Sequence, residues 1–568
     1  MNKLNYFVLY LAFIGLISCD DYFLPEPDNT YTDDILLTRP SFVEGLLMQG
    51  YTGLPNGYSF NFETATDDAV TNDLTSAYLR LATGEWSSQY GATGSWSEDY
   101  TKIYYLNKFL DIYESADYAV DISRPASDND IRNALYLKRL KGEAYGLRAW
   151  YKFELLRAYG GKSADGDLLG FPIVDKTLLP EDDLELPRNT YAESVTSILS
   201  DIDIAIANLP EVYENSGDAN YDAVMGNKLD GRMNGKAAKA LRSRVVLQAA
   251  SPAFSESSGV TWEEAAKISG EFLSELGDLY QEGIAFYSTI DSKELIWNQS
   301  RQLTLGWENQ NFPPSLFGSA RTNPSQNLVD AFPMNNGYPI SHELSGYDPE
   351  NPYKNRDSRL NTYIIYNGAE FKGNTIFTYE GQSIDGIRAQ ENSTRTGYYL
   401  KKLMDESVSL RPGNQVSTNH IYTLFRETEI HLNFAEAANE AWGPNGDPNG
   451  YGFTARTIVK ELRARAGISS TDTYLNGITS IEEMRALIRN ERRLELCFEG
   501  FRFWDIRRWN DVATMQEPVK GVYISNSENT FSYDYREIEN RIYEPFMIYG
   551  PIPYNETLKY NLKQNNGW

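Results

Sequence analysis

Apolar residues recur at three- and four-residue steps in four long segments, which is the pattern of helices that bury one face. These segments run from Leu137 to Tyr159, from Asn234 to Ala250, from Glu427 to Trp442 and from Ile481 to Arg508. The second ends before a Ser-Pro pair and the third before a Gly-Pro pair, both plausible helix stops. The fourth begins after a serine that lies three residues before a glutamate, as in a capping box.

Small residues alternate with aromatic ones along these segments, which favours closely packed helix pairs of the tetratricopeptide kind. The spacing departs from the regular repeat, so we expect long insertions between the pairs. Residues 295–425 are rich in Gly, Asn, Pro and Tyr, with short apolar runs, and predict loops and short strands. The predicted fold is mostly α, with a helical scaffold over about 95–290 and 425–510 and a loop-rich insertion over about 295–425. No composition change divides residues 31–568, so we predict one domain.

The chain begins with a segment typical of a secreted lipoprotein. A lysine supplies the positive charge, and the apolar stretch that follows is too short for a comfortable membrane span. The stretch ends at LISC, residues 16–19, which resembles the bacterial lipobox. We therefore predict a signal peptide over residues 1–18, lipidation of Cys19 and an acidic, proline-bearing tether over residues 19–30.

Composition narrows the function. The 568 residues include 79 Asp and Glu against 52 Lys and Arg, a formal net charge of −27, which argues against nucleic acid and anionic lipid heads as partners. Only three histidines and two cysteines are present, which excludes a His-rich metal centre, a zinc ribbon and a disulfide scaffold. We expect no metal and no other cofactor. Aromatic residues make up 13% of the chain, with 40 Tyr and 10 Trp, which is rich for an ordinary enzyme.

No motif points to catalysis, so we predict no catalytic residues. GKS at 161–163 lacks the glycine that a phosphate loop needs, and no nucleophile elbow is present. Asp-Gly-Asp at 165–167 and Asn-Gly-Asp at 445–447 could lend oxygens to calcium, but neither completes an EF-hand loop, and both predict turns. The dense Glu and Arg cluster over 491–508 has helical spacing, which favours structural ion pairs over an anion site.

Five segments in order along the chain carry a family resemblance. They are GEAYGLRAWYKF at 142–153 with RAYGG at 157–161, NPSQNLVDAFPM at 323–334, TGYYLKK at 396–402, NERRLEL at 490–496 continuing to 509, and the C-terminal stretch 551–568. Together with the lipobox, this ordered set resembles the SusD/RagB outer-membrane lipoproteins of Bacteroidetes. The resemblance implies a non-catalytic, lipid-anchored protein on the outer face of the outer membrane. It would capture a glycan and hand it to a SusC-like TonB-dependent transporter.

Two alternatives stay open at this stage. The RagB branch of the family handles peptides, so the same architecture could capture a peptide or protein fragment. A surface glycosidase is the more distant alternative, because carboxylate pairs are abundant but no catalytic motif is recognisable.

Two aromatic and polar stretches outside the helical segments are the predicted ligand platform. Sugar rings need flat aromatic faces for stacking and planar polar groups for their hydroxyls. The stretches lie at 67–96 and 297–317, and family members build their platforms from comparable regions. Trp96 and Trp297 are instead expected in the core. The predicted stacking residues are Trp86, Tyr90, Trp307 and Phe312, and the predicted hydroxyl partners are Asp73, Arg80 and Asn309.

Overall fold

The computed structural model describes residues 39–58, 62–279, 287, 289, 292–381, 384–528 and 530–568. The predicted signal peptide, Cys19 and the acidic tether lie outside the described residues, so they stay predictions. Within the described ranges, no helix combines the length and the apolar character needed to cross a bilayer.

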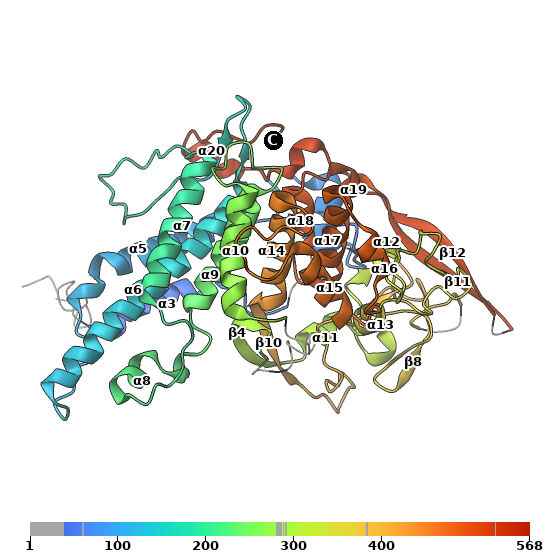
Figure 1. Ribbon diagram of the computed structural model, residues 1–568, viewed down its shortest axis with the longest axis horizontal. Helices are drawn as coiled ribbons and strands as arrows, with labels where there is room; N and C mark the ends of the chain where they lie inside the picture. Colours follow the sequence, from blue (N-terminus) through green and yellow to red (C-terminus); the bar gives the residue numbers. More distant parts are fainter. Residues whose placement is uncertain are drawn as a thin grey trace, which may run out of the picture.

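Long helices stand side by side and form most of the scaffold (Figure 1). Contacts run from α5 to α6, α7, α9, α10, α14 and α17 in turn, while α3 packs on α5 and α6. This arrangement confirms the predicted, mostly α class. The long helices are α3 (Pro40–Thr52), α5 (Trp96–Ile112), α6 (Ala126–Tyr159), α7 (Tyr191–Asn208), α9 (Gly235–Ala250), α10 (Trp262–Leu276), α14 (Glu427–Trp442), α15 (Ala455–Arg465) and α17 (Ile481–Leu496).

Shorter helical turns connect these elements. The short α-helices are α4 (Ala77–Arg80), α8 (Ala219–Met225), α11 (Gly306–Asn311), α12 (Gln326–Ala331), α13 (Ser358–Tyr363), α16 (Thr473–Gly477), α18 (Arg502–Arg508), α19 (Val512–Gln516) and α20 (Tyr554–Lys559). The remaining turns, of 3-10 or π type, are η1 (Phe62–Ala65), η2 (Leu81–Glu85), η3 (Tyr113–Ser115), η4 (Asn227–Leu229), η6 (Pro314–Leu316) and η7 (Pro545–Ile548).

The described strands form small antiparallel pairs rather than one sheet. The longest pairs are β4 with β10, beside the helical scaffold, and the hairpin β11–β12, which projects at one end of the molecule (Figure 1). The pairs are β1 (Ala69–Val70) with β5 (Asn323–Pro324), β2 (Gly161–Lys162) with β3 (Leu168–Leu169), β4 (Leu295–Thr304) with β10 (Thr418–Arg426), β6 (Ile364–Ile365) with β9 (Tyr399–Leu400), β7 (Ala369–Phe371) with β8 (Asn374–Ile376), and β11 (Val519–Ser527) with β12 (Thr530–Glu539).

Three of the four predicted helices form where the sequence places them. Helix α14 has the predicted bounds, and α9 begins one residue after Asn234, whose side chain caps the helix by accepting from the Ala237 backbone N–H. Helix α6 covers the first predicted segment but begins earlier, at Ala126. Its start follows Pro125, and its first turns are exposed, so they lack the apolar periodicity on which the prediction depended.

The fourth predicted helix is not continuous, and that prediction is wrong. The capping box of Ser480 and Glu483 is present at the start of α17, but α17 ends at Leu496 and a separate helix, α18, begins at Arg502. Phe498 and Gly500 adopt left-handed backbone angles, with φ of 63° and 83°, and so reverse the chain between the two helices.

Charged residues of this α17–α18 region are buried and paired. Glu491 accepts from Arg359 and Arg463, and both guanidiniums are almost fully buried. Arg492 pairs with Asp505 at 2.8 Å. The structural interpretation of this cluster is confirmed.

The core also contains the residues that the sequence assigns to it. Trp96 and Trp297 are buried in the main hydrophobic core, together with the inward faces of α6 and α9. Cys497, a free and buried cysteine, belongs to a second core beneath the loop-rich region. His431 is buried too, and its Nδ1 lies 2.9 Å from the Glu427 carbonyl oxygen, so it is a structural histidine.

Candidate functional site

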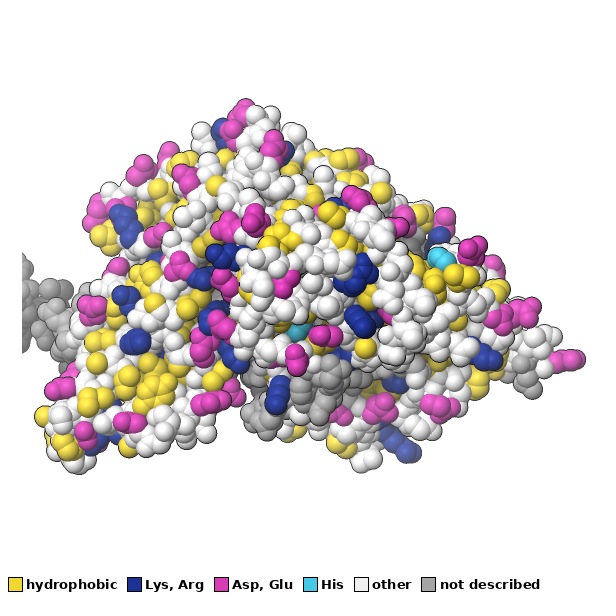
Figure 2. Space-filling view, in the orientation of Figure 1, with side chains coloured by type: hydrophobic (Ala, Val, Ile, Leu, Met, Phe, Trp, Pro, Cys, Tyr) yellow, Lys and Arg dark blue, Asp and Glu magenta, His cyan; other side chains and the backbone are white. Residues whose placement is uncertain are grey.

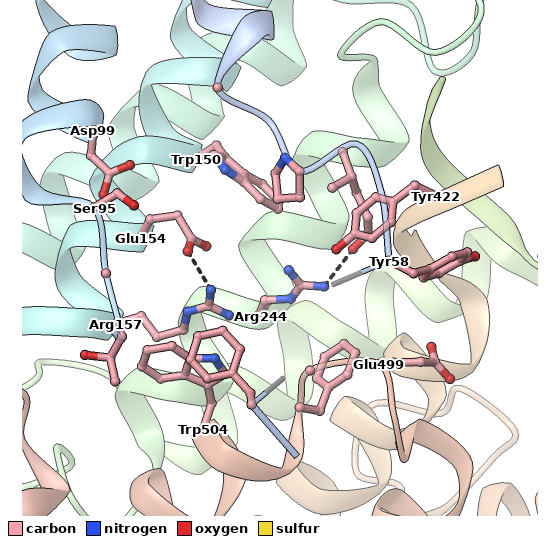
Figure 3. A pocket seen from close by; sticks show the side chains of 18 of the residues that line it. Tyr58, Ser95, Asp99, Trp150, Glu154, Arg157, Arg244, Tyr422, Glu499 and Trp504 are labelled. Atoms are coloured by element: carbon pink, nitrogen blue, oxygen red, sulfur yellow. Dashed lines mark hydrogen bonds and ion pairs between the residues drawn. The ribbon is translucent and has the colours of Figure 1, made fainter. Parts of the chain in front are cut away.

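A cavity of about 340 Å³ opens where the helical scaffold meets β10 and the turn between α17 and α18. Figure 3 shows its lining side chains, which come from widely separated parts of the chain. The lining residues are Gly53, Pro55, Tyr58, Phe62, Tyr78, 92–95, Asp99, Trp150, Tyr151, Glu154, Arg157, Arg244, Leu403, 422–424, 499–501 and Trp504. The volume lies at the lower end of the range usual for small-molecule sites, about 300–1,000 Å³.

Aromatic rings make up much of the cavity wall. Tyr58 and Tyr422 lie side by side, with ring centroids 5.4 Å apart. Phe62 contacts both Tyr78 and Trp504, at centroid distances of 4.9 and 5.6 Å. Such rings offer the flat apolar faces on which sugar rings stack.

Arg157 and Glu154 occupy the polar side of the cavity (Figure 3). Both project from the last turns of α6, three residues apart, and an Arg157 Nη donates to a Glu154 Oε at 2.5 Å. The Arg157 guanidinium also lies over the Trp504 ring, 4.3 Å from its centroid. Helical spacing thus fixes one ion pair at the edge of an aromatic surface.

Arg244 projects from α9 into the middle of the site (Figure 3). It donates to both carboxylate oxygens of Glu429, each at 2.7 Å, and to the Leu424 carbonyl oxygen. Its guanidinium lies 4.0 Å from the centroid of the Phe425 ring. This bidentate pairing holds Arg244 in one orientation.

Asp99 faces the same side of the cavity as Glu154 (Figure 3). Burial raises the pKa of Asp99 to about 8, and the neighbouring Glu154 carboxylate raises it as well, while Arg157 opposes the shift. The Asp99 carboxyl group is therefore protonated at neutral pH and can donate a hydrogen bond.

Three residues of the cavity wall keep a buried polar atom without a hydrogen bond to any described residue. These atoms are Glu154 Oε1, Arg157 Nε and Thr423 Oγ1. A buried polar atom without a partner costs about 1–3 kcal/mol, and such atoms also occur away from the cavity, for example Trp86 Nε1 and Arg489 Nε. The three atoms of the wall lie beneath the cavity surface, where they are closed off from solvent.

Three of the predicted stacking residues are buried in the structure, and their contact with a ligand stays a prediction. Trp86 is 4% exposed, Trp307 5% and Phe312 0%. Trp86 packs against Trp568, Trp307 against Tyr58, and Phe312 against Phe371. Aromatic side chains in loops contribute large apolar areas, and here that area closes the core.

The other predicted site residues lie nearer the surface. Arg80 and Tyr90 come together, with the guanidinium 3.9 Å from the ring centroid, and Arg80 also pairs with Glu85. Asp73 accepts from the backbone and the hydroxyl of Thr75, and Asn309 is exposed. None of the seven predicted residues lines the cavity, so their roles in binding stay predictions.

Sequence reasoning missed the residues that do line the cavity. Arg157 and Trp504 stand within the segments that carry the family resemblance, but they are not among the predicted binding residues. A signal was present in α6, because Glu154 and Arg157 interrupt a stretch that is otherwise almost completely buried. Tyr58, Arg244 and Tyr422 carried no comparable signal, since only the fold brings them together.

The described residues contain no group of three or more His, Cys, Asp or Glu side chains that could hold a metal ion. The two acidic turns considered for calcium have other partners. Asp165 and Asp167 pair with Lys563, and Asp447 accepts from the backbone N–H groups of Tyr451 and Gly452.

Comparison with protein families places most of the described chain. Residues 281–568 match the family described as the SusD family, and residues 31–247 match the family described as "Starch-binding associating with outer membrane". The chain is also similar to the SusD-like protein P38 of Formosa agariphila, with 23% identity over 91% of this chain and 93% of that protein.

Solved structures share the fold. A SusD-like carbohydrate-binding protein from Bacteroides fragilis superposes with a TM-score of 0.70 and 23% identity, covering 93% of this chain and 99% of that one. A laminarin-binding SusD-like protein superposes with a TM-score of 0.56 and 18% identity, covering 94% of this chain and 100% of that one.

Proposed function

The chain belongs to the SusD family, and from that premise we propose that it captures glycans in the cavity described above and delivers them to a SusC-like TonB-dependent transporter. SusD family members are non-catalytic binding proteins, so the surface glycosidase alternative is set aside. The second matching family is described as associating with the outer membrane.

The cavity wall is the observation that carries this proposal. It combines aromatic faces, such as those of Tyr78 and Tyr422, with polar side chains, among them Ser95, Glu154 and Arg157. A sugar presents an apolar ring face and several hydroxyls, and it would therefore match both features at once. The carbohydrate-binding and laminarin-binding proteins that share the fold support a glycan over a peptide.

The proposed function also includes a lipid anchor at Cys19 and a TonB-dependent transporter as the partner protein. Lipidation of Cys19 would hold the protein at the outer membrane, facing the exterior, and two or three acyl chains would make that attachment stable. Replacement of Cys19 by alanine should release the protein from the membrane fraction. Copurification of a TonB-dependent barrel with the lipidated protein would identify the transporter.

The direct test of the function is affinity electrophoresis against plant, host and microbial polysaccharides. We expect retardation in at least one polysaccharide gel, with no release of sugar from it. Tyr78→Ala should weaken that binding by about 1–3 kcal/mol because it removes a ring from the cavity wall. Tyr104→Ala is the matched control, since Tyr104 is exposed on α5 and lies outside the cavity.

Two results would contradict the proposal. Binding to oligopeptides with silence across every polysaccharide would favour the peptide-capturing branch of the family. Equal loss of affinity in Tyr78→Ala and Tyr104→Ala would place the ligand outside this cavity.

A further inference from the structure

Both cations among the described residues that line the cavity, Arg157 and Arg244, already have carboxylate partners. Arg157 donates to Glu154, and Arg244 holds Glu429 through two hydrogen bonds. Each guanidinium also lies over an aromatic ring, Trp504 for Arg157 and Phe425 for Arg244. Neither cation is therefore left to neutralise an incoming negative charge.

Carboxyl groups outnumber cations on the same wall. Glu154 and Asp99 lie on one side of the cavity, and Glu499 lies on the other (Figure 3). Glu499 accepts from Arg426 and Lys402, so its charge is balanced behind the wall. A ligand that entered would meet balanced ion pairs and the neutral carboxyl group of Asp99.

We propose that this cavity accepts uncharged sugar residues and excludes acidic ones, such as uronates and sulfate esters. The inference rests on the proposed glycan capture and specifies its ligand class. The observation that carries it is the pairing of Arg157 and Arg244 within the wall.

The physical reason is the difference between burying a hydroxyl and burying a charge. A hydroxyl needs only hydrogen-bond partners, which polar side chains of the wall such as the exposed Ser95 can supply. A carboxylate or sulfate loses its hydration and must find a counter-charge, or the cost of burial far exceeds that of a neutral group. Here it would have to break an existing ion pair to obtain one.

The negative charge of the whole protein also disfavours the binding of acidic glycans. The formal net charge is −27, and Asp and Glu side chains are spread over the visible face in Figure 2 rather than gathered in one patch. An acidic glycan would therefore approach against a repulsive field, which salt would screen.

The test compares each neutral polysaccharide with its own acidic form. Laminarin, starch and galactan are each used intact and after selective oxidation of the C6 hydroxymethyl group to a carboxylate, which keeps the linkages and changes the charge. Titration calorimetry with the full-length protein in detergent measures both forms. We expect the intact form of the bound glycan to bind at least roughly tenfold more tightly than its oxidised form.

Glu154→Gln then tests the mechanism. This variant leaves the Arg157 guanidinium without its carboxylate, so the preference for the intact form should shrink by roughly fivefold. Glu271→Gln is the control, because Glu271 is an exposed carboxylate on α10, outside the cavity, and should leave the preference unchanged. Thermal midpoints of both variants confirm that they fold.

The binding results distinguish a failure of this inference from a failure of the proposed function. If the protein binds both forms equally, or binds the oxidised form more tightly, glycan capture stands and the exclusion of acidic sugars is refuted. If none of the intact or oxidised glycans binds, the proposed function fails and the inference fails with it. An unchanged preference in Glu154→Gln would overturn the role assigned to the paired Arg157.

Discussion

The paired region around Glu436 and Arg508, on α14 and α18, and the cavity wall around Glu154 and Arg157 each contain an ion pair, but the two pairs differ in how completely their polar atoms are hydrogen-bonded. In the first region, Arg508 donates to both carboxylate oxygens of Glu436 at 2.6 Å, and Trp509 donates to the same carboxylate. In the second, Glu154 and Arg157 share one hydrogen bond and each keeps a buried polar atom without a partner among the described residues.

The difference affects how much each pair stabilises the fold. A fully paired buried network fixes the relative positions of helices, and any ligand would have to disrupt it. A partly paired group keeps a buried polar atom unsatisfied, at a cost of about 1–3 kcal/mol. The Glu436–Arg508 pair is therefore the more strongly stabilising of the two.

The largest expected effect is on the paired region. Arg508→Ala removes the partner of a buried carboxylate and should lower the free energy of unfolding by about 4 kcal/mol. Urea denaturation measures the change. Arg536→Ala is the control, because Arg536 belongs to an exposed ion pair with Asp534 and its loss should leave the urea midpoint unchanged.

The ion pair between Glu436 and Arg508 also makes the free energy of unfolding depend on pH. Burial alone would raise the pKa of Glu436, but Arg508 lowers it from 4.5 to about 2. The stabilisation is therefore complete above pH 4.5 and is lost as the pH falls towards 2. Glu436→Gln should cost about 3 kcal/mol at neutral pH, and the difference from the wild type should shrink in acid. A difference that stays constant down to pH 2.5 would contradict the pairing.

The cavity wall should respond to pH in the opposite sense. Because burial raises the pKa of Asp99 from 3.8 to about 8, its neutral form stabilises the fold below pH 3.8, and this contribution is lost as the pH rises through 8. Asp99→Asn should therefore gain stability relative to the wild type, by about 4 kcal/mol more at pH 9 than at pH 5. Thermal melts of both proteins across that range measure the gain, and parallel profiles would refute it.

The smallest expected effect gives the most direct comparison, because the same Thr→Val substitution is made once in the paired region and once in the cavity wall. The Thr428 hydroxyl donates to Glu294 and accepts from Arg465, whereas the Thr423 hydroxyl has no partner among the described residues. Thr428→Val should therefore lower the free energy of unfolding by about 1 kcal/mol or more.

Thr423→Val should leave the free energy of unfolding within about 0.5 kcal/mol of the wild type, because its hydroxyl has no hydrogen bond to lose among the described residues. Urea denaturation of the two variants measures both free energies of unfolding. Equal destabilisation by the two substitutions would remove the distinction between the paired region and the cavity wall.

Much of the fold could be predicted from periodicity and capping. The bounds of α14, the N-cap at Asn234 and the capping box at Ser480 follow from local rules that act within a few residues. The break between α17 and α18 could not be predicted in this way. Phe498 takes a left-handed angle that few non-glycine residues adopt, and surrounding contacts impose it.

The site was less accessible to sequence reasoning. Trp86, Trp307 and Phe312 look like stacking residues because loop aromatics with polar neighbours are typical of sugar sites, yet all three are buried. The composition of a loop does not tell which side of a ring faces the protein. Arg80 and Tyr90, predicted as a hydroxyl partner and a stacking residue, contact each other outside the cavity.

The sequence by itself determined the helical class, the family and the buried role of the Glu and Arg cluster, because these depend on short-range spacing and on ordered motifs. Only the tertiary structure decided which residues form the cavity, since Tyr58, Arg157 and Tyr422 are far apart in the chain. It also decided which charges are satisfied. Pairing depends on distances of a few ångströms between elements that fold together from distant segments, and a linear sequence does not contain those distances.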